Sequence, residues 1–495
     1  MPSRPLWLAL AITALLTVIR MTGTVDSDVA WQLWIAGRMH AGANLYHDII
    51  ETNPPLWFWM ALPVDRLATI LHVRSEPVLG VAIGILVALS LVATELLIRH
   101  IHRERRSLLL SYGALALMAM PWVHLGQREQ IVLIASLPYA ALIAARRCRQ
   151  PIPASLAILI GIGAALGFAL KQYFLLVPMA LELWLLAGQR KSWRLIRPET
   201  VAMAAMGIAY AVALAALEPD FFTTIIPMLR IAYGVFGAPS VGFMFGPFVD
   251  LGLLILGFTA LYARLFADRG TPFSAAMLIT STAFAVIYFV QFKGWPYHAI
   301  PLIGCASMAL AALLAEVESS PLVFRTAGPA LLALPLLLAF DEQTTPTLPN
   351  RDMRAALEGL RPGDTVAFLT TETAVPWSVT LQGRYRYASR YNGFWMMQAV
   401  INNELQGGLD EKAANLGRKI VADTVADFTC TPPLRIFVSR PREGEAGFDI
   451  LPFFLRDPRF RELMSHYRVR SRTTIETYEL ASPLPKPVGP CRQGI

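Results

Sequence analysis

Residues 26–57 read DSDVAWQLWIAGRMHAGANLYHDIIETNPPLW and follow directly on the first apolar segment of the chain. The stretch carries four carboxylates, at Asp26, Asp28, Asp48 and Glu51, next to a segment that is able to enter a bilayer. Acidic side chains close to hydrocarbon are costly and usually mark a functional site or a pathway. The sequence therefore predicts a polar site at a membrane surface.

The composition is that of an integral membrane protein. Of the 495 residues, 55% are hydrophobic and only 16% are charged, and the mean hydropathy is +0.49. These values lie far from those of a soluble domain. About eleven apolar segments are long enough, or nearly long enough, to cross a bilayer: residues 5–21, 78–98, 107–122, 130–145, 154–170, 173–188, 200–217, 247–266, 272–291, 299–315 and 322–340. The first shows no clear cleavage site, so we expect a spanning helix and not a removed signal peptide.

The basic residues indicate the orientation. They are concentrated in short loops at residues 99–106, 146–149 and 190–197, which alternate regularly with the other loops. Lys and Arg favour the cytoplasmic side of a membrane. We therefore expect a cytoplasmic N-terminus in the inner membrane of a bacterium and a periplasmic segment after residue 340. This pattern accounts for the net charge of +8, so no nucleic-acid partner is expected.

Two domains are predicted. Residues 1–340 form the multi-spanning domain, whose first outer loop, 22–77, contains interfacial helices at 28–40 and 56–72. Residues 341–495 form a small α/β domain. Its predicted helices are 350–360 and 410–428, and its predicted strands are 364–369, 434–438 and one or two within 466–479. The expected fold class is thus an α-helical membrane protein of about eleven spans with a small α/β domain at the C-terminus.

The four cysteines divide between the two domains. Cys148 lies in a basic loop and Cys305 in an apolar segment, where a free thiol is the ordinary state. Cys430 and Cys491 both lie in the C-terminal domain, and in an oxidising compartment they are expected to pair. None of the cysteine spacings is typical of a metal site.

The first outer loop resembles that of the GT-C superfamily, the multi-spanning glycosyltransferases that take a sugar from a polyprenyl-phosphate carrier. The resemblance comes from an Asp that opens an aromatic-rich helix, a Gly turn with Tyr at 42–48, and the run ETNPPL at 51–56. This run is similar to the acidic-x-Pro-Pro-Leu signature of the family, with Asn53 where many relatives have Lys. The resemblance covers roughly residues 20–310 and is to the bacterial protein mannosyltransferase and lipid A aminoarabinose transferase type.

The resemblance implies a general base in this loop. Inverting glycosyl transfer needs a carboxylate that takes the proton from the attacking hydroxyl. Asp28 matches the family position, and Asp26 would be its electrostatic neighbour. N-capping of the following helix is an alternative explanation for one of the two. Glu51 is a further catalytic candidate, because a rigid re-entry into the next helix explains Pro54 and Pro55 but not the acid.

Other outer turns add a second acid and a set of phosphate-binding candidates. Glu129, which follows Arg128, is similar to a second acidic position of the superfamily, and a simple Arg–Glu surface pair is the alternative. Lys171 and Gln172 resemble a turn near the carrier phosphate, where a cation would neutralise the leaving group. A lysine that only extends its charge to the interface is the alternative here.

Lys293 and His298 lie in an aromatic turn broken by Gly and Pro. They are predicted to bind the phosphate, or His298 is predicted to join Glu51 at a metal ion. A single Glu and a single His do not define a metal site, so no metal ligand is assigned and a divalent ion is left open. With the predicted topology, all of these polar residues fall on the outer side, which favours one shared outward-facing site.

The sequence therefore predicts a membrane glycosyltransferase. It would move a sugar from a polyprenyl-phosphate donor to a lipid, glycan or protein acceptor of the cell envelope. The alternative is a transporter or flippase of a lipid-linked precursor, which is also rich in polar residues at helix breaks. Neither inverted repeats nor midplane charges are visible, so the transferase is favoured. A non-catalytic assembly protein is a further alternative, in which the carboxylates would be dispensable.

Overall fold

The computed structural model describes residues 3–99, 103–234, 240–265, 272–316, 322–344, 351–440, 448–473, 475–485 and 491. The chain forms two compact units. Unit 1 comprises residues 1–24, 67–213 and 238–346, and unit 2 comprises residues 25–66, 214–237 and 347–495. The sequence predicts a domain boundary at residue 340, with residues 25–66 in the first domain. In the structure, residues 25–66 belong to the same unit as the C-terminal domain. Each unit is described by itself.

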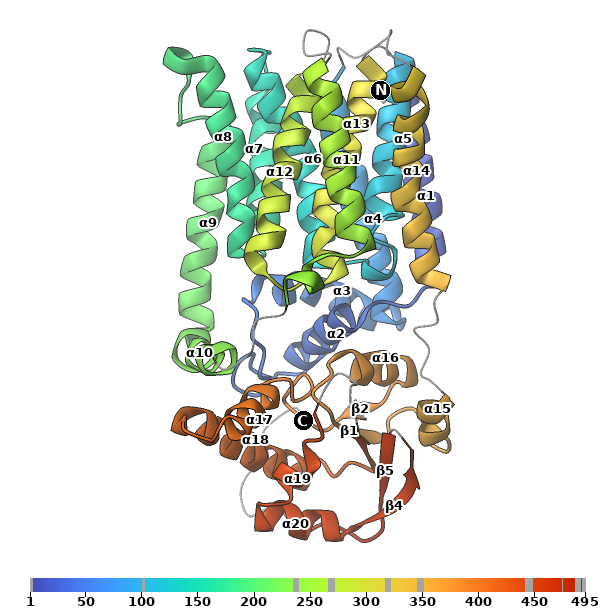
Figure 1. Cartoon of the computed structure of the whole chain (residues 1–495), viewed down its shortest axis with the longest axis vertical. Coiled ribbons are helices and arrows are strands. Elements are labelled where there is room, and N and C mark those ends of the chain that lie inside the picture. Colours follow the sequence, from blue (N-terminus) through green and yellow to red (C-terminus); the bar gives the residue numbers. More distant parts are fainter. Residues whose placement is uncertain are drawn as a thin grey trace. The chain divides into compact units, whose positions relative to one another are not determined.

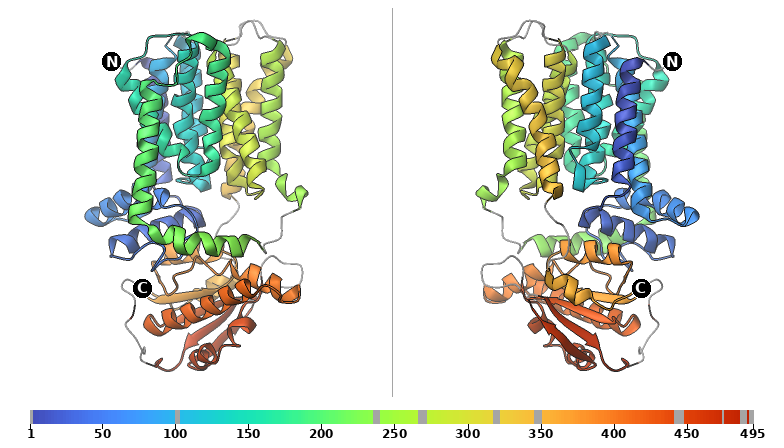
Figure 2. Two further views of the ribbon diagram at one scale, coloured as in Figure 1. Left: turned by 90° about the vertical axis from the view of Figure 1, so that its left-hand side faces the viewer. Right: turned by 90° about the vertical axis from the view of Figure 1, so that its right-hand side faces the viewer.

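Unit 1 is a bundle of helices that run side by side (Figures 1 and 2). They are α1 (Arg4–Arg20), α4 (Ser75–Leu97), α5 (Arg103–Met118), α6 (Arg128–Arg147), α7 (Ala154–Phe168), α8 (Leu176–Gln189), α9 (Pro198–Leu217, whose last turn belongs to unit 2), α11 (Pro247–Leu265), α12 (Pro272–Gln291), α13 (Ile300–Glu316) and α14 (Leu322–Thr344). Each corresponds to one predicted apolar segment. Among the described helices, 7 are long and apolar enough to cross a membrane. The multi-spanning helical fold is confirmed. The helices α1, α5, α7 and α8 are shorter than these seven spans.

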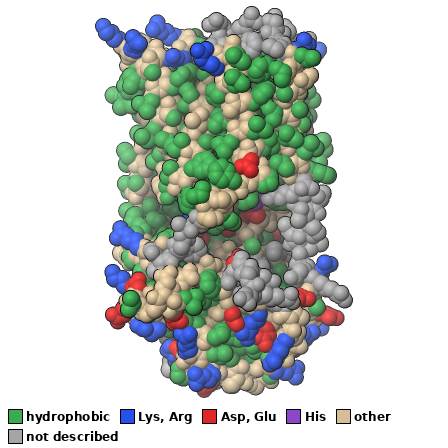
Figure 3. Space-filling model, in the orientation of Figure 1, with side chains coloured by type: hydrophobic (Ala, Val, Ile, Leu, Met, Phe, Trp, Pro, Cys, Tyr) green, Lys and Arg blue, Asp and Glu red, His purple; other side chains and the backbone are tan. Residues whose placement is uncertain are grey.

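Burial divides the helices into central and peripheral ones. In α6 and in the 296–315 segment that contains α13, 94% of the residues in the apolar window are buried, whereas no residue in the window of α9 is buried. Hydrophobic side chains cover the sides of the bundle in Figure 3, as expected where lipid replaces water. Close packing depends on small residues: a Cβ on Gly167 of α7 would lie 2.5 Å from the Cβ of Ala135 of α6.

Lys and Arg side chains gather at one end of the bundle (Figure 3). At this end Arg146 forms two hydrogen bonds with the fully buried Glu199, of 3.0 and 2.9 Å. Arg197 donates to the same Glu199 at 2.8 Å and also pairs with Glu182. The basic loops therefore do more than indicate the orientation of the protein. Their arginines also form a buried ion-pair network that connects α6, α8 and α9.

Unit 2 contains residues 25–66 of the loop after α1, the end of α9 with the segment that follows it, and the C-terminal domain. Its helices are α2 (Ser27–His40), the first part of α3 (Leu56–Leu71), α10 (Ile226–Gly234), α15 (Arg351–Leu357), α16 (Ala374–Gly383), α17 (Met397–Leu405), α18 (Glu411–Cys430), α19 (Leu451–Phe454) and α20 (Pro458–Ser465). Both predicted interfacial helices are present. Asp410 and Asp457 cap α18 and α20 through hydrogen bonds to backbone amides, which explains where these helices begin.

The sheet of unit 2 has five strands in the order β2-β1-β3-β5-β4. They are β1 (Thr365–Leu369), β2 (Arg386–Tyr387), β3 (Arg435–Ser439), β4 (Tyr467–Arg472) and β5 (Ile475–Leu480). β1 is parallel to β2 and β3, while β5 is antiparallel to β3 and β4. The α/β fold predicted after residue 340 is confirmed. Its central strands β1 and β3 were predicted, because both are apolar runs, whereas the short strand β2 was not.

A disulfide and a buried ion pair stabilise this unit. Cys430 and Cys491 form the predicted disulfide, and Cys148 and Cys305 are free. The buried Arg390 donates from Nε to both carboxylate oxygens of Asp427, at 3.1 and 3.0 Å. The backbone carbonyl of Arg390 in turn accepts from the amide of Ile50 at 2.8 Å. A backbone hydrogen bond at Ile50, the residue before Glu51, thus joins the first outer loop to the C-terminal domain.

Candidate active site

The predicted site residues form two polar groups, one in each unit. The first group begins at the N-terminus of α2, where Asp26 is the N-cap and its Oδ1 accepts from the amide of Val29 at 2.9 Å. The capping explanation therefore applies to Asp26. Asp28 lies in the first turn of the same helix and is half-buried. Its carboxylate is not the N-cap, and it lies at the positive end of the helix dipole.

Glu51 accepts four hydrogen bonds within the loop. It is buried, and its Oε1 accepts from the amides of Thr52 and Asn53 and from Nδ2 of Asn53, each at 2.7 Å. Its Oε2 accepts from Nε1 of Trp31. Hydrogen bonds to an ionised group are the strong ones. Glu51 therefore fixes the turn before Pro54, and it ties this turn to α2.

Asp48 stabilises the preceding turn. Its Oδ2 accepts from the amide and the Nδ2 of Asn44, at 2.9 and 3.2 Å, and its Oδ1 contacts Nδ1 of His47 at 2.9 Å. Burial raises the pKa of Asp48, but the hydrogen bonds from Asn44 and His47 outweigh burial, so the pKa lies below its usual value. The Gly turn with Tyr is closed by Gly42 and Tyr46, which have φ of 96° and 69°.

Aromatic rings support α2 from the C-terminal domain. Trp31 stacks on Trp34 with ring centroids 4.8 Å apart, and both contact Trp377 of α16, at 4.5 and 5.2 Å. Trp34 also meets Tyr387 of β2 edge to face at 6.0 Å. The ring that donates to Glu51 is therefore held by residues that follow it in the chain by more than 300 positions.

Replacing Trp31 by Phe tests this arrangement. The variant keeps an aromatic ring for stacking but removes the Nε1–H donor, which leaves an oxygen of the buried Glu51 without its bond. A hydrogen bond to a charged group contributes about 1.5–3 kcal/mol, so we expect a loss of that size in the free energy of unfolding, measured by thermal unfolding of the solubilised protein. Trp34→Phe is the matched control, with a smaller expected loss. Equal losses in both variants would show that the Glu51 bond contributes nothing.

The second group lies in unit 1, at the end of the bundle where α6, α8 and α13 begin. Nζ of Lys171 lies 2.5 Å from Oε1 of Glu129, 3.1 Å from Nε2 of His298 and 3.4 Å from Oε1 of Gln291. Nε2 of His298 lies 3.5 Å from the same Glu129 oxygen. Glu129 and His298 are buried and Lys171 is nearly so. Three predicted residues from three separate turns thus form one cluster.

Further cations surround this cluster. Lys171, Arg128, Lys293 and His124 all act electrostatically on His298. Burial lowers the pKa of Lys293, a cost that a bound anion would offset. Among these side chains, the acid Glu129 lies with the cations of Lys171, Arg128 and Lys293. Such a group is suited to a phosphate.

Two atoms of the cluster are available to a ligand. Oε2 of Glu129 and Nδ1 of His298 are buried and have no hydrogen-bond partner among the residues that the structure describes. Buried polar atoms are nearly always bonded, so exceptions need an explanation such as a ligand or water. Both atoms belong to residues that the sequence singled out.

The turn before Glu129 is fixed by its neighbours. Oε1 of Gln130 accepts from the amide of Gly126 at 2.6 Å, and Nε2 of Gln130 donates to the carbonyl of Leu117 at 2.8 Å. Gly126 has φ of 86°, and a Cβ there would lie 2.8 Å from Leu79. Arg128 and Glu129 are therefore held at the start of α6 by a turn that requires glycine.

Several residues fall outside these contacts or were not predicted. Gln172 begins a short 3-10 helix and is exposed. Gln291 was not predicted, although a Gln at the end of an apolar segment indicates a polar environment there. Trp31 was not predicted as a site residue, although it lies in the aromatic-rich helix expected at 28–40. Within the described part of the chain, no group of three or more His, Cys, Asp or Glu could hold a metal ion.

The fold is shared with a solved structure over nearly the whole chain. The chain is similar to the crystal structure of ArnT from Cupriavidus metallidurans bound to undecaprenyl phosphate, with a TM-score of 0.56 at 13% identity, over 98% of this chain and 99% of that chain. The resemblance noted in the first outer loop is thus confirmed for the fold, and it extends over both units. No family model and no curated protein match the chain.

Two further GT-C structures are similar over a smaller part of their length. Archaeal oligosaccharyltransferase AglB from Archaeoglobus fulgidus, in complex with an inhibitory peptide and a dolichol-phosphate, has a TM-score of 0.44 at 13% identity, over 88% of this chain and 68% of that chain. Arabinofuranosyltransferase AftD from Mycobacteria has a TM-score of 0.47 at 15% identity, over 97% of this chain and 40% of that chain. Because both TM-scores are below 0.5, the fold assignment depends on the ArnT structure.

Proposed function

We propose that this protein is a membrane glycosyltransferase that moves a sugar from a polyprenyl-phosphate donor to an acceptor of the cell envelope. The observation that carries the proposal is the cluster around Lys171, Glu129 and His298, with Arg128 and Lys293 nearby, at one end of a GT-C bundle. The ArnT structure that shares this fold is bound to undecaprenyl phosphate. An anionic lipid head group would pair with the cations of the cluster.

The cluster provides leaving-group stabilisation. When the bond between the sugar and the phosphate breaks, negative charge develops on the phosphate, and preorganised cations stabilise that charge most where water is excluded. Lys171 is held by Glu129 and Gln291, so its ammonium group needs no reorganisation when the phosphate departs. His298 presents Nδ1 as an additional hydrogen-bonding atom.

The acceptor must lose a proton as its hydroxyl attacks the sugar. We assign this role to Asp28, because it lies in the first turn of α2, at the position where the resemblance of this loop implies the base. Asp26 caps α2, and Glu51 accepts four hydrogen bonds from its own loop. Glu51 then acts as a positioning residue for the turn that follows α2. Attack by the hydroxyl from the face opposite the leaving phosphate inverts the anomeric centre.

We further propose that the protein lies in a bacterial inner membrane, with the basic loops in the cytoplasm and residues 341–495 in the periplasm. The concentration of Lys and Arg at one end of the bundle supports this orientation. The disulfide between Cys430 and Cys491 supports an oxidising compartment for the C-terminal domain. The donor lipid would then be used at the periplasmic face.

The native cysteines allow a test of this orientation. Cys148 is a free and exposed thiol in a basic loop, whereas Cys305 is buried. In intact spheroplasts a membrane-impermeant maleimide is expected to leave Cys148 unlabelled until the membrane is permeabilised. A Glu411→Cys variant, at an exposed position of the C-terminal domain, is expected to react without permeabilisation. The reverse pattern of labelling would contradict the orientation.

Mass spectrometry of envelope glycans tests the activity itself. A strain that lacks this protein is expected to lose one glycan modification, and the wild-type gene is expected to restore it, whereas an Asp28→Asn gene at equal expression is not. Accumulation of the unused polyprenyl-phosphate sugar would accompany the loss. Unchanged glycans in the deletion strain would overturn the assignment as a transferase.

A further inference from the structure

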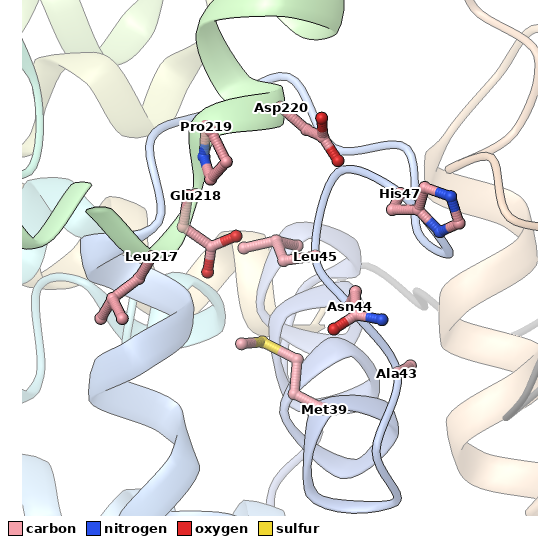
Figure 4. A pocket seen from close by; sticks show the side chains of 9 residues that line it. All are labelled: Met39, Ala43, Asn44, Leu45, His47, Leu217, Glu218, Pro219 and Asp220. Atoms are coloured by element: carbon pink, nitrogen blue, oxygen red, sulfur yellow. The ribbon is translucent and has the colours of Figure 1, made fainter. Parts of the chain in front are cut away.

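A cavity in unit 2 lies outside both groups of candidate residues. It has a volume of about 410 Å³ and lies between the turn after α2 and the junction of α9 with the following segment. Figure 4 shows its lining, which comprises Met39, Ala43, Asn44, Leu45, His47, Leu217, Glu218, Pro219 and Asp220. Its volume lies within the range of about 300–1,000 Å³ that is typical of small-molecule sites.

The walls of the cavity are fixed. Asp48 closes the turn through Asn44 and His47, as described above. The ring of Tyr46 packs on Phe221, 5.2 Å between centroids, and this contact joins the two walls. The segment after the cavity, Phe221–Ile225, is a π-helical turn, a feature that often occurs at functional sites. The pocket is therefore preformed.

Glu218 is the principal polar side chain of the cavity. It is only 8% exposed, and its Oε1 accepts from Nε1 of Trp59 at 3.2 Å. Burial raises the pKa of Glu218, the bond from Trp59 opposes this effect, and the charge of Asp220 adds to it. The carboxylate oxygens of Glu218 can accept hydrogen bonds from hydroxyl groups of a ligand. In Figure 4 its carboxyl group points toward Leu45 across the cavity.

The lining selects against anionic ligands. Two carboxylates without a lining Lys or Arg repel phosphate and other anions. Glu218, Asp220 and His47 do not form a metal-binding group within the described residues. Carboxyl and amide groups beside aliphatic side chains suit a neutral ring that bears several hydroxyl groups. The hydroxyls of such a ring would bond to Glu218, Asp220 and Asn44, while its carbon atoms would contact Met39 and Leu217.

The cavity also lies where a spanning helix ends. Leu217 is the last residue of α9, a candidate membrane span whose apolar window has no buried residue. The cavity is therefore lined in part by the residue that ends this candidate span. A sugar attached to a membrane lipid would lie next to the end of such a span.

We propose that this cavity binds a sugar ring of a membrane-anchored glycan, the acceptor of the transfer, with Glu218 as its main hydrogen-bonding residue. The assignment as an acceptor site rests on the proposed transferase function. Binding of the glycan itself does not require turnover, so the two can be tested separately.

The test uses the full chain, solubilised in detergent and fluorescently labelled, on an array of immobilised bacterial envelope glycans. The wild-type protein is expected to bind at least one glycan, and Glu218→Ala is expected to weaken that binding about 10-fold, because one or two hydrogen bonds are lost. Glu218→Gln, whose amide also donates and accepts, is expected to bind more tightly than Glu218→Ala. Ala43→Phe is expected to block the cavity without removing a polar group.

Glu411→Ala, at an exposed acid of the same unit, is the matched control and should bind as the wild type does. Thermal unfolding of each variant shows whether it folds. The proposal would be overturned if folded Glu218→Ala and Ala43→Phe bound glycans as tightly as the wild type does. It would also be overturned if the wild type bound no glycan. A loss of binding to polyprenyl-phosphate sugar, with array binding intact, would assign the cavity to the donor and overturn the acceptor assignment. Binding of undecaprenyl phosphate, measured in parallel, reports on the transferase proposal alone and is expected to be unchanged.

Discussion

Replacing Asp28 by Asn is expected to lower the rate of glycosyl transfer by about 10²–10⁴-fold, because general base catalysis typically contributes that factor. The amide keeps the shape of the carboxylate but cannot take a proton from the acceptor. Folding should change little, since the N-cap of α2 is Asp26 and the loss of one acid from a first helical turn costs only about 0.3–1 kcal/mol. The measurement is turnover of purified protein at equal amount, with separate values of kcat and KM. The decrease should appear in kcat.

Asp26→Asn is the matched control in the same turn. Asn caps helices about as well as Asp, so the bond to the amide of Val29 should persist and activity should fall far less. An Asp28→Leu variant separates the chemical role from the structural one, because it removes the polar group as well as the charge. A purely structural role predicts near-normal activity for Asp28→Asn and a lower protein yield for Asp28→Leu. Wild-type turnover by Asp28→Asn at normal expression would end the assignment of Asp28 as the base.

The elements of this fold could be predicted where a local pattern determines them. The apolar segments anticipated the helices of the bundle, because the thickness of the bilayer fixes the length of a spanning helix. The strands Thr365–Leu369 and Arg435–Ser439 are apolar runs within a more polar domain, and this local pattern predicts them. The short strand Arg386–Tyr387 has no such pattern, and only its pairing with β1 defines it.

The polar groups could be predicted only in part. Topology placed Glu129, Lys171 and His298 on one side of the membrane, but their contact depends on how α6, α8 and α13 pack. This packing joins residues 42 and 127 positions apart in the chain. The bond from Trp31 to Glu51 likewise depends on the turn between them, and the Glu218 cavity is formed by segments about 170 residues apart. No local pattern carries such information.

Removing the charge of Lys171 is expected to weaken binding of the polyprenyl phosphate. A hydrogen bond between charged groups contributes about 1.5–3 kcal/mol, which corresponds to roughly 10- to 100-fold in KM for the donor. A lysine that only extends its charge to the interface would predict no change. The experiment is complicated because Lys171 also neutralises the buried Glu129, and an uncompensated buried charge costs about 3–5 kcal/mol.

The double variant Lys171→Met with Glu129→Gln removes this complication, since both charges are lost together. We expect it to fold, to unfold thermally near the wild-type temperature, and to bind undecaprenyl phosphate at least 10-fold more weakly. Lys171→Arg keeps the cation and should retain more binding, while Gln172→Ala, at the exposed neighbouring position, should bind as the wild type does. Because the interaction is ionic, the difference between wild type and double variant should shrink as salt concentration rises. Equal binding by wild type and a folded double variant would exclude the cluster as the phosphate site, and Arg128 and Lys293 would no longer have a common ligand to explain their position.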